Sequence, residues 1–515
     1  MTKPTRLIAV LLAAACAAGA VQAQPVWITL GDAAYAELQR AAPQAIARES
    51  SATRSTPLRL AGRERLHLVE VDEPQLLALS AAVHRRLHRC GGFMAHPSEA
   101  AGLTALRPAA RTALAAPTRP SYAIAQQAVA GPMLSQMQAS NIGQTIVDMS
   151  AYANRYYTTN NGVNASNWLL QRWSALAAGR ADIAVSQFTH GAFPQKSVIV
   201  TINGTDNGSQ VVVLGGHLDS INQAGTGETT RAPGADDDAS GVASLTELLR
   251  VIVASGYHPR RTIKLIGYAA EEVGLRGSQD IAQSFQRDGV NVVGVMQLDM
   301  TNYHGSAYDI YLYTDYTDSS QNDFVQRLIG AYLPTLKVGF DQCGYACSDH
   351  ASWTAQGYWT SMPFETTLDE DNPYIHTADD TYANSGSQAD NALKFARMAM
   401  AYAVELGSEG PGVPPPADRT ETASGTLAKG QKVSYGPYKV AAGGSFAATL
   451  SGSGDTDLYV RKGAAASTSS YDCKSDGPTS AESCTVSLSA NGDVYLLLNG
   501  YSAASYTLTV KYRPQ

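Results

Sequence analysis

The fold is decided by the stretch Val211-Val-Val-Leu-Gly-Gly-His-Leu-Asp219 and the helical pattern that follows it over 240–254. Residues 211–216 form an uninterrupted apolar, β-branched run, which is typical of a strand buried on both faces. Such strands alternating with helices are the building units of α/β proteins. The stretch therefore predicts an α/β domain with a mostly parallel central sheet flanked by helices.

The same alternation extends over residues 121–409, which we expect to form one catalytic domain. Predicted strands are Val211–Gly216, Thr262–Ala270 and Val292–Met300. Predicted helices lie near Ser140–Tyr157, Ser240–Ala254, Ser319–Leu333 and Asn391–Leu406. A proline-rich stretch at 410–420 predicts an extended linker. Short alternating stretches separated by Gly, Ser and Asn over 421–515 then predict a small C-terminal β-sandwich.

The first 23 residues have the pattern of a signal peptide. Lys3 and Arg6 precede an apolar run over 7–20, and small residues lead to a cleavage site at Ala23. Cys16 after three alanines leaves a lipoprotein as an alternative. The run is shorter than the roughly 20 apolar residues that span a bilayer, so we expect no stable membrane insertion. The sequence predicts a secreted protein that transits the periplasm.

Residues 24–120 differ in charge from the rest of the chain. They contain twelve arginines, no lysine and eight acidic residues, whereas the whole chain has a net charge of −7. A basic segment with a lone Cys90 before an acidic remainder predicts a propeptide that folds onto the catalytic domain as an intramolecular inhibitor or chaperone. An ordinary N-terminal domain is the alternative. No concentrated basic face is found, which argues against nucleic acid as a partner, and we expect a monomer.

Four of the six cysteines form two local pairs. Cys343 lies close to Cys347, and Cys473 lies close to Cys484. In an exported protein both pairs predict disulfides. A metal clip is the weaker alternative for the first pair, because no second pair of cysteines completes a zinc-ribbon site.

Histidine and carboxylate residues recur at the ends of the predicted strands and in the loops after them. The set is His217, Asp219, Asp237, Glu271, Glu272, Asp299 and His376. In open α/β sheets the carboxyl edge of the strands is where ligands and metals bind. Any one of these residues alone could be structural, and only the whole set indicates a site.

Local context assigns roles within this set. Asp219 could accept the second ring N–H of His217 and fix its tautomer. Three adjacent carboxylates at 236–238 repel one another without a cation, although Asp238 or Ser240 could simply cap the next helix. A central Asp237 could bridge two ions. Adjacent Glu271 and Glu272 point in different directions, so one can bind metal and the other can act as general base.

Two ions of mixed nitrogen and oxygen ligation then follow. One ion has a histidine, an aspartate and a shared aspartate, and the other has the same shared aspartate, a glutamate and a histidine. This ligand set suits two zinc ions per catalytic domain, without excluding cobalt or manganese.

Five strings resemble the secreted bacterial leucyl aminopeptidases of the two-zinc exopeptidase family. They are Gly-Gly-His-Leu-Asp-Ser, Pro-Gly-Ala-Asp-Asp-Asp-Ala-Ser-Gly, Ala-Glu-Glu-Val-Gly-Leu-Arg-Gly-Ser, Gln-Leu-Asp-Met-Thr-Asn-Tyr and Cys-Gly-Tyr-Ala-Cys-Ser-Asp-His-Ala-Ser-Trp. The resemblance covers about residues 121–409. It implies His217 and Asp299 at one zinc, Glu272 and His376 at the other, and Asp237 bridging both. It also implies Glu271 as the catalytic base, Asp219 as the partner of His217, and a cis peptide bond between Asp237 and Asp238.

The resemblance also implies an apolar pocket for the N-terminal side chain of the substrate, near Met300, Tyr345, Met362, Phe364 and Ile375. Tyr345 could in addition donate a hydrogen bond to the oxyanion. Leu368 and Asp371 stand where relatives have aromatic residues. The tail resembles the prepeptidase C-terminal domain found on secreted bacterial peptidases.

We therefore expect a secreted aminopeptidase acting on peptides or proteins with a free N-terminus, with preference for large apolar residues such as leucine. A carboxypeptidase, a dipeptidase or a glutaminyl cyclase on the same scaffold is the nearest alternative. A catalytically dead binding module is the alternative from another class.

Overall fold

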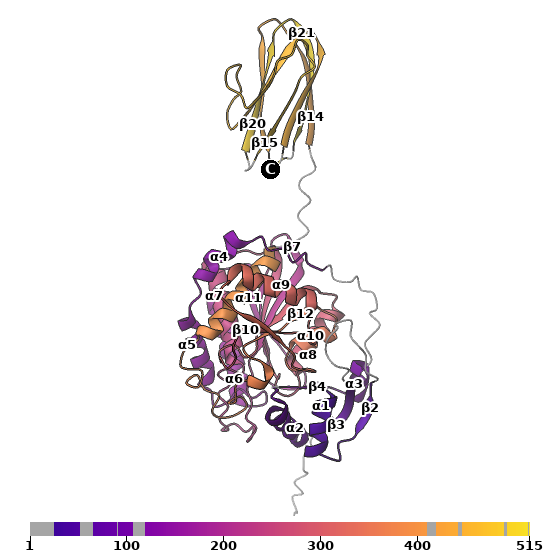
Figure 1. Cartoon of the computed structure of the whole chain (residues 1–515), viewed down its shortest axis with the longest axis vertical. Helices are drawn as coiled ribbons and strands as arrows, with labels where there is room; N and C mark the ends of the chain where they lie inside the picture. Colours follow the sequence, from indigo (N-terminus) through magenta and orange to yellow (C-terminus); the bar gives the residue numbers. More distant parts are fainter. Residues whose placement is uncertain are drawn as a thin grey trace, which may run out of the picture. The chain divides into compact units, whose positions relative to one another are not determined.

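The chain forms two compact units, residues 1–410 and residues 411–515, in a computed structural model (Figure 1). The structure describes residues 25–51, 65–89, 91–106, 119–408, 419–440, 445–488 and 492–512, and residue 514. The predicted signal peptide, Cys90 and the predicted linker as far as residue 418 lie outside the described residues. Within the described ranges, no helix combines the length and the apolar character needed to cross a membrane.

A six-stranded sheet forms the centre of the first unit, in the order β12-β9-β7-β8-β6-β5. The strands are β5 (Ile183–Phe188), β6 (Ser197–Ile202), β7 (Asn207–His217), β8 (Arg261–Tyr268), β9 (Asn291–Gln297) and β12 (Thr360–Ser361). The β12–β9, β9–β7 and β7–β8 pairs are parallel. The β8–β6 and β6–β5 pairs are antiparallel. The predicted α/β class is confirmed, with a central sheet that is mixed.

Both faces of this sheet are covered, which explains the uninterrupted apolar run in β7. Val212 and Leu214 point to one hydrophobic cluster, whereas Val211 and Val213 point to another. The first face is covered by α4 (Gln127–Ser135), α5 (Ala139–Ser150), α6 (Asn160–Leu176), α7 (Ala239–Ala254), α9 (Ser319–Tyr332) and α11 (Asp390–Ser408). The second face is covered by α8 (Arg276–Arg287) and α10 (His350–Ala355). A three-stranded sheet of β10 (Ile310–Tyr313), β11 (Val338–Asp341) and β13 (Pro363–Phe364) lies beside them, followed by the short helix η1 (Leu368–Glu370).

Two strands end earlier than the sequence predicted. β8 stops at Tyr268 and β9 stops at Gln297, and shortly beyond these ends Ala270 and Met300 adopt left-handed backbone conformations with φ of 54° and 59°. A residue in this region cannot continue a strand. The turns therefore place the acidic residues that follow at the edge of the sheet.

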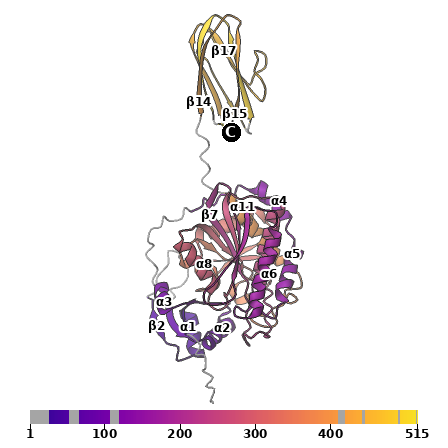
Figure 2. The same cartoon turned by 180° about the vertical axis from the view of Figure 1, so that it is seen from behind.

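The N-terminal segment, here defined as the described residues between 25 and 106, forms its own antiparallel sheet in the order β2-β3-β1-β4. Its elements are β1 (Val26–Gly31), α1 (Asp32–Ala41), β2 (Ala47–Ser50), β3 (Leu66–Val71), α2 (Glu73–Leu87), β4 (Phe93–His96) and α3 (Glu99–Leu106). These elements lie together at one end of the first unit (Figure 2). Their core also contains Ala269, Ala270 and Val273, so the segment is packed against the loop after β8.

The second unit consists of two four-stranded antiparallel sheets, ordered β14-β21-β16-β19 and β15-β20-β17-β18. The strands are β14 (Arg419–Leu427), β15 (Lys432–Val440), β16 (Ser445–Ser453), β17 (Thr456–Lys462), β18 (Cys473–Ser475), β19 (Ser483–Ser487), β20 (Gly492–Gly500) and β21 (Ala504–Tyr512). Residues from both sheets form one hydrophobic cluster. The predicted Cys473–Cys484 disulfide is present and joins β18 to β19, and hence one sheet to the other.

Candidate metal centre and active site

The five predicted metal ligands converge on one buried cluster. His217 ends β7, Asp237 directly precedes the N-cap of α7, Glu272 and Asp299 follow β8 and β9, and His376 lies in the loop before α11. Each of the five is at most 4% exposed. Because β7, β8 and β9 are parallel, their carboxyl ends meet at one edge of the sheet. We call these five residues the metal cluster.

Asp237 lies at the middle of the metal cluster. Its Oδ1 is 2.9 Å from Nε2 of His217, and its Oδ2 is 3.1 Å from Nε2 of His376. Burial alone would raise the pKa of Asp237, but the hydrogen bonds from the two histidines hold that pKa well below its usual value. One carboxylate oxygen therefore faces each histidine, which is the arrangement of a bridging ligand.

Each histidine has a second carboxylate beside it. Oδ1 of Asp299 is 3.5 Å from Nε2 of His217. Oε2 of Glu272 is 2.8 Å from Nε2 of His376. Burial and the neighbouring Asp237 raise the pKa of Glu272 to about 7, against the attraction of His376. The cluster thus divides into two groups that share Asp237.

The residues of this region fit bound cations. Within the described part of the chain, Oε1 of Glu271 has no hydrogen-bond partner, and Asp237 Oδ2 and Glu272 Oε2 share the single Nε2 of His376, at 3.1 and 2.8 Å. Buried carboxylates with too few donors are costly, and several around one point call for a ligand that satisfies them together. Carboxylate oxygens and neutral imidazole nitrogens are the donors that zinc accepts.

Glu271 lies beside the metal cluster but makes none of its short contacts. Its Oε2 is 4.0 Å from Nε2 of His217. Burial raises the pKa of Glu271 well above its usual value, although the positive His217 opposes that effect. A buried carboxylate with a free oxygen near bound cations is suited to accept and return a proton.

The carboxylate of Asp219 accepts hydrogen bonds from the backbone of Glu271 and Glu272. Its Oδ1 accepts from the N–H of Glu271 at 3.0 Å, and its Oδ2 accepts from the N–H of Glu272 at 3.2 Å. Nδ1 of His217 lies 3.5 Å from Oδ1 of Asp219 and 3.2 Å from its backbone oxygen. Asp219 therefore holds the base and a ligand in place, as well as lying beside the His217 ring as predicted.

The three adjacent carboxylates have separate partners. Asp238 accepts from the N–H groups of Gly241 and His217, at 2.8 and 2.9 Å, and so caps α7. Asp236 accepts from the N–H of Asn302 at 2.9 Å. Only Asp237 enters the metal cluster, and the Asp237–Asp238 peptide bond is cis. The capping alternative is thus correct for Asp238, and the predicted cis bond is present.

Two supporting residues were not predicted. Ser348 donates to Oδ2 of Asp299 at 2.5 Å. Asp380 accepts from the N–H groups of Asp236 and Asp237, at 3.0 and 3.1 Å. Both contacts join residues far apart in the chain, so neither spacing nor local pattern signals them. Ser348 does follow Cys347 within a motif that the sequence had singled out.

The residues predicted to form the apolar pocket divide into two groups. Met300, Met362, Phe364 and Ile375 form one buried cluster with both half-cystines of the Cys343–Cys347 disulfide. Tyr345 belongs to a different cluster. Its hydroxyl lies 2.8 Å from Oγ1 of Thr29 and 3.1 Å from Sδ of Met94. Tyr345 therefore contacts the N-terminal segment, and its predicted place in the pocket stays a prediction.

Helix α2 of the N-terminal segment ends beside the metal cluster. The rings of His84 and His376 lie 5.1 Å apart between centroids. Nδ1 of His88, at the C-cap of α2, is 3.7 Å from Oδ1 of Asp371. Burial raises the pKa of Asp371 to about 6. Asp371 also interacts electrostatically with His376 and Asp237. The segment therefore contacts one of the metal ligands and a carboxylate close to it.

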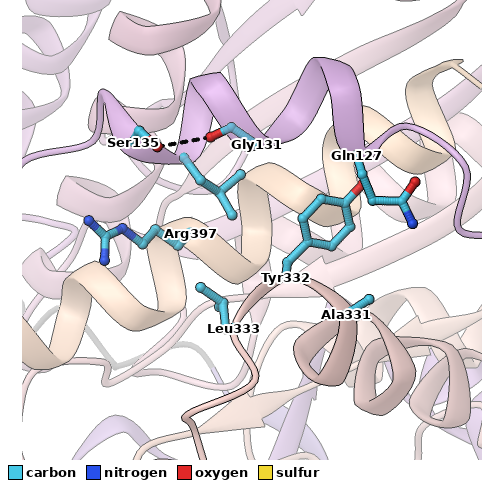
Figure 3. Close-up of a pocket in the computed structure, with 8 residues that line it drawn as sticks. Gln127, Gly131, Ser135, Ala331, Tyr332, Leu333 and Arg397 are labelled. Atoms are coloured by element: carbon cyan, nitrogen blue, oxygen red, sulfur yellow. Dashed lines mark hydrogen bonds between the residues drawn. The ribbon is translucent and has the colours of Figure 1, made fainter.

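A hollow of about 430 Å³ lies elsewhere in the first unit, between α4, α9 and α11 (Figure 3). Gln127, Gly131, Leu134 and Ser135 line it from α4. Tyr332 and Arg397 face it from the other two helices. It contains none of the residues of the metal cluster.

Comparison with known proteins places this geometry among the peptidases. Residues 197–403 match the family described as Peptidase family M28, and residues 439–500 match the bacterial pre-peptidase C-terminal domain. Leucine aminopeptidase 1 of Coccidioides posadasii (strain C735) is 34% identical over 297 residues, which are 55% of this chain and 75% of that protein. Leucine aminopeptidase 1 of Fusarium vanettenii is 33% identical over 303 residues, covering 56% of this chain and 75% of that protein.

Two solved structures are similar to a larger share of the chain. The LapA aminopeptidase of Legionella pneumophila is 28% identical with a TM-score of 0.62, and the match covers 75% of this chain and 99% of the LapA chain. LapB from the same organism is 29% identical with a TM-score of 0.61, and the match covers 75% of this chain and 100% of the LapB chain.

Proposed function

The chain belongs to peptidase family M28 and is a metallo-aminopeptidase, and we propose that it works with two zinc ions on peptides with a large apolar N-terminal residue such as leucine. His217 and Asp299 would hold one ion, Glu272 and His376 the other, and Asp237 both. The observation that carries this proposal is the position of Asp237, with one oxygen near each histidine.

Glu271 is the proposed general base. Zinc, when bound, would supply Lewis acidity and lower the pKa of bound water. Glu271 would accept a proton from the water that attacks the first peptide carbonyl, and would return that proton to the departing amine. Its free Oε1 and its contact distance of 4.0 Å to His217 support this role, because the carboxylate lies beside the cluster rather than within it.

The proposed side-chain preference follows from the buried apolar group beside Asp299. Met300 directly follows that ligand in the chain, and it packs with Met362, Phe364 and Ile375. An apolar lining favours an apolar substrate side chain, because burial of such a chain contributes about 25 cal/mol per Å².

The N-terminal segment is proposed to be a propeptide that inhibits the enzyme until it is removed. Its support is the contact of α2 with His376 and Asp371 and the contact of Thr29 with Tyr345. We further propose that the chain is exported by the signal peptide at 1–23 and acts as a monomer. Both proposals rest on the sequence patterns described above.

The test uses leucyl-p-nitroanilide and its N-acetylated form, before and after limited proteolysis of the folded chain. We expect chelator-sensitive cleavage of the free-amine compound alone, with an increase after the N-terminal segment is cleaved off. Cleavage of the blocked compound would contradict an aminopeptidase. Cleavage of neither compound by a zinc-loaded, processed chain would contradict the proposed substrate class and favour another reaction on this scaffold, such as glutaminyl cyclisation.

A further inference from the structure

His84 belongs to the N-terminal segment, yet its ring lies beside the metal cluster. It occupies the last turn of α2, and its ring centroid is 5.1 Å from that of His376 with the ring planes 41° apart. The helix is held in this position by its other face, where Leu76, Leu79 and Val83 pack in a core shared with the loop after β8. The approach of His84 is therefore built into the docking of the segment.

The His84 ring has an unsatisfied nitrogen. Its Nδ1 is buried and has no hydrogen-bond partner among the described residues. A buried donor or acceptor left without a partner costs about 1–3 kcal/mol. One cation between the rings of His84 and His376 would satisfy this nitrogen.

The ring separation agrees with two imidazoles on one ion. With zinc–nitrogen bonds of about 2.1 Å and tetrahedral angles, the centroids of two bound imidazole rings lie roughly 5 Å apart. Packing of the two rings without a metal would also account for the separation, but it would leave Nδ1 of His84 unsatisfied.

We propose that His84 is a ligand of the ion beside Glu272 and His376 while the N-terminal segment is attached. A catalytic zinc keeps one position for water or substrate, and the histidine would take that position in the unprocessed chain. The inference rests on the proposed function, because it needs the metal cluster to hold cations. By linkage, metal binding would tighten docking of the segment, and docking would tighten metal binding by the same factor.

His84→Phe is the informative variant, because it retains an aromatic ring against His376 and removes the nitrogens. His88→Ala is the matched control. His88 lies one turn later at the same end of α2 and faces Asp371, so its loss weakens docking without removing the proposed ligand.

The experiment uses the full chain with its N-terminal segment intact, loaded with Co²⁺ or Zn²⁺. The visible absorption of high-spin Co²⁺ depends on its coordination number and ligands. We expect His84→Phe, but not His88→Ala, to change that spectrum. We also expect His84→Phe to speed the release of zinc to a chelator by about tenfold or more, in the range known for loss of groups that support metal sites.

Each outcome decides one question. Unchanged spectrum and release rate in His84→Phe would overturn the assignment of His84 as a ligand. Equal changes in both variants would also overturn it, because loosened docking would then explain them. If wild-type chain, intact or processed, binds neither ion, the proposed two-zinc function fails instead.

Discussion

Glu271 and Glu272 are neighbours in the chain, but their side chains have different surroundings. Oε2 of Glu272 lies 2.8 Å from Nε2 of His376, whereas Oε2 of Glu271 lies 4.0 Å from Nε2 of His217. The first is placed as a ligand and the second as a base. This difference can be tested by changing one carboxylate at a time to an amide.

We expect Glu271→Gln in the processed enzyme to lower kcat by about 10²–10⁴-fold, because the amide cannot accept the proton of the attacking water. The zinc content should stay at the wild-type value, since Glu271 is not a ligand. Steady-state kinetics together with elemental analysis measure both quantities. Glu272→Gln is the matched variant and should lose zinc as well as activity. Near-normal turnover by zinc-loaded Glu271→Gln would refute the assignment of the base.

Asp219 allows a second prediction, because it holds the backbone of both glutamates. In Asp219→Asn one oxygen becomes an NH₂ group, which would face the N–H of Glu271 or Glu272. We expect zinc affinity, measured by chelator competition, to fall about 10–100-fold. Asp206→Asn is the control, since Asp206 pairs with Arg260 at the surface. Equal zinc affinity in the two variants would show that the backbone contacts of Asp219 do not support the metal centre.

The start of helix α7 shows how an element positions the site. Gly241 lies in the first turn of α7, where Asp238 caps the helix and Asp237 faces the metal cluster. A Cβ atom at Gly241 would meet the backbone oxygen of Leu298 and would lie 2.5 Å from Oδ1 of Asp238. No side chain larger than hydrogen therefore fits between α7 and the end of β9.

Gly241→Ala should lower the free energy of unfolding by about 1–3 kcal/mol, the usual cost of overpacking. Zinc affinity should also fall, because the clash pushes apart the elements that carry Asp237 and Asp299. Gly330→Ala in α9 is the control, since a Cβ there meets no atom within 4 Å. That change should raise stability by about 1 kcal/mol through helix propensity. Denaturant unfolding measures the stability of the two variants. If Gly241→Ala were as stable as the wild-type chain, the tight contact at Gly241 would be contradicted.

The elements and the metal cluster were predictable from sequence because they depend on local pattern. Continuous apolar runs mark β7, β8 and β9, and the ligands lie at or just past their ends. The positions at which β8 and β9 stop were not predictable, since no local pattern signals the left-handed conformations of Ala270 and Met300 just beyond the strand ends. The antiparallel pairing of β6 with β8 is likewise a long-range contact without a local signal.

Contacts between distant segments were the other part that sequence could not supply. The composition of residues 24–120 indicated a segment that folds onto the catalytic domain, but it did not show that His84 reaches His376 or that Thr29 reaches Tyr345. Ser348 and Asp380 were missed for the same reason, because their partners are distant in the chain.

At the scale of the whole molecule, the chain has two units with separate hydrophobic cores. The metal cluster, its supporting residues and the N-terminal segment all belong to the unit of residues 1–410. The core of the second unit is made by residues of its own two sheets, which the Cys473–Cys484 disulfide joins. No residue of the proposed mechanism comes from the second unit.

A chain truncated after residue 410 should therefore fold, bind zinc and, once processed, cleave leucyl-p-nitroanilide with the kcat/KM of the full enzyme. The physical reason is that truncation removes no ligand, no base and no residue of the cores in residues 1–410. Calorimetry provides a second measurement, because units with independent cores should unfold in separate transitions. We expect the truncated chain to lose one transition of the full chain and to retain the other at the same temperature. A shifted remaining transition, or a large fall in kcat/KM, would show that the second unit stabilises the catalytic unit or takes part in catalysis.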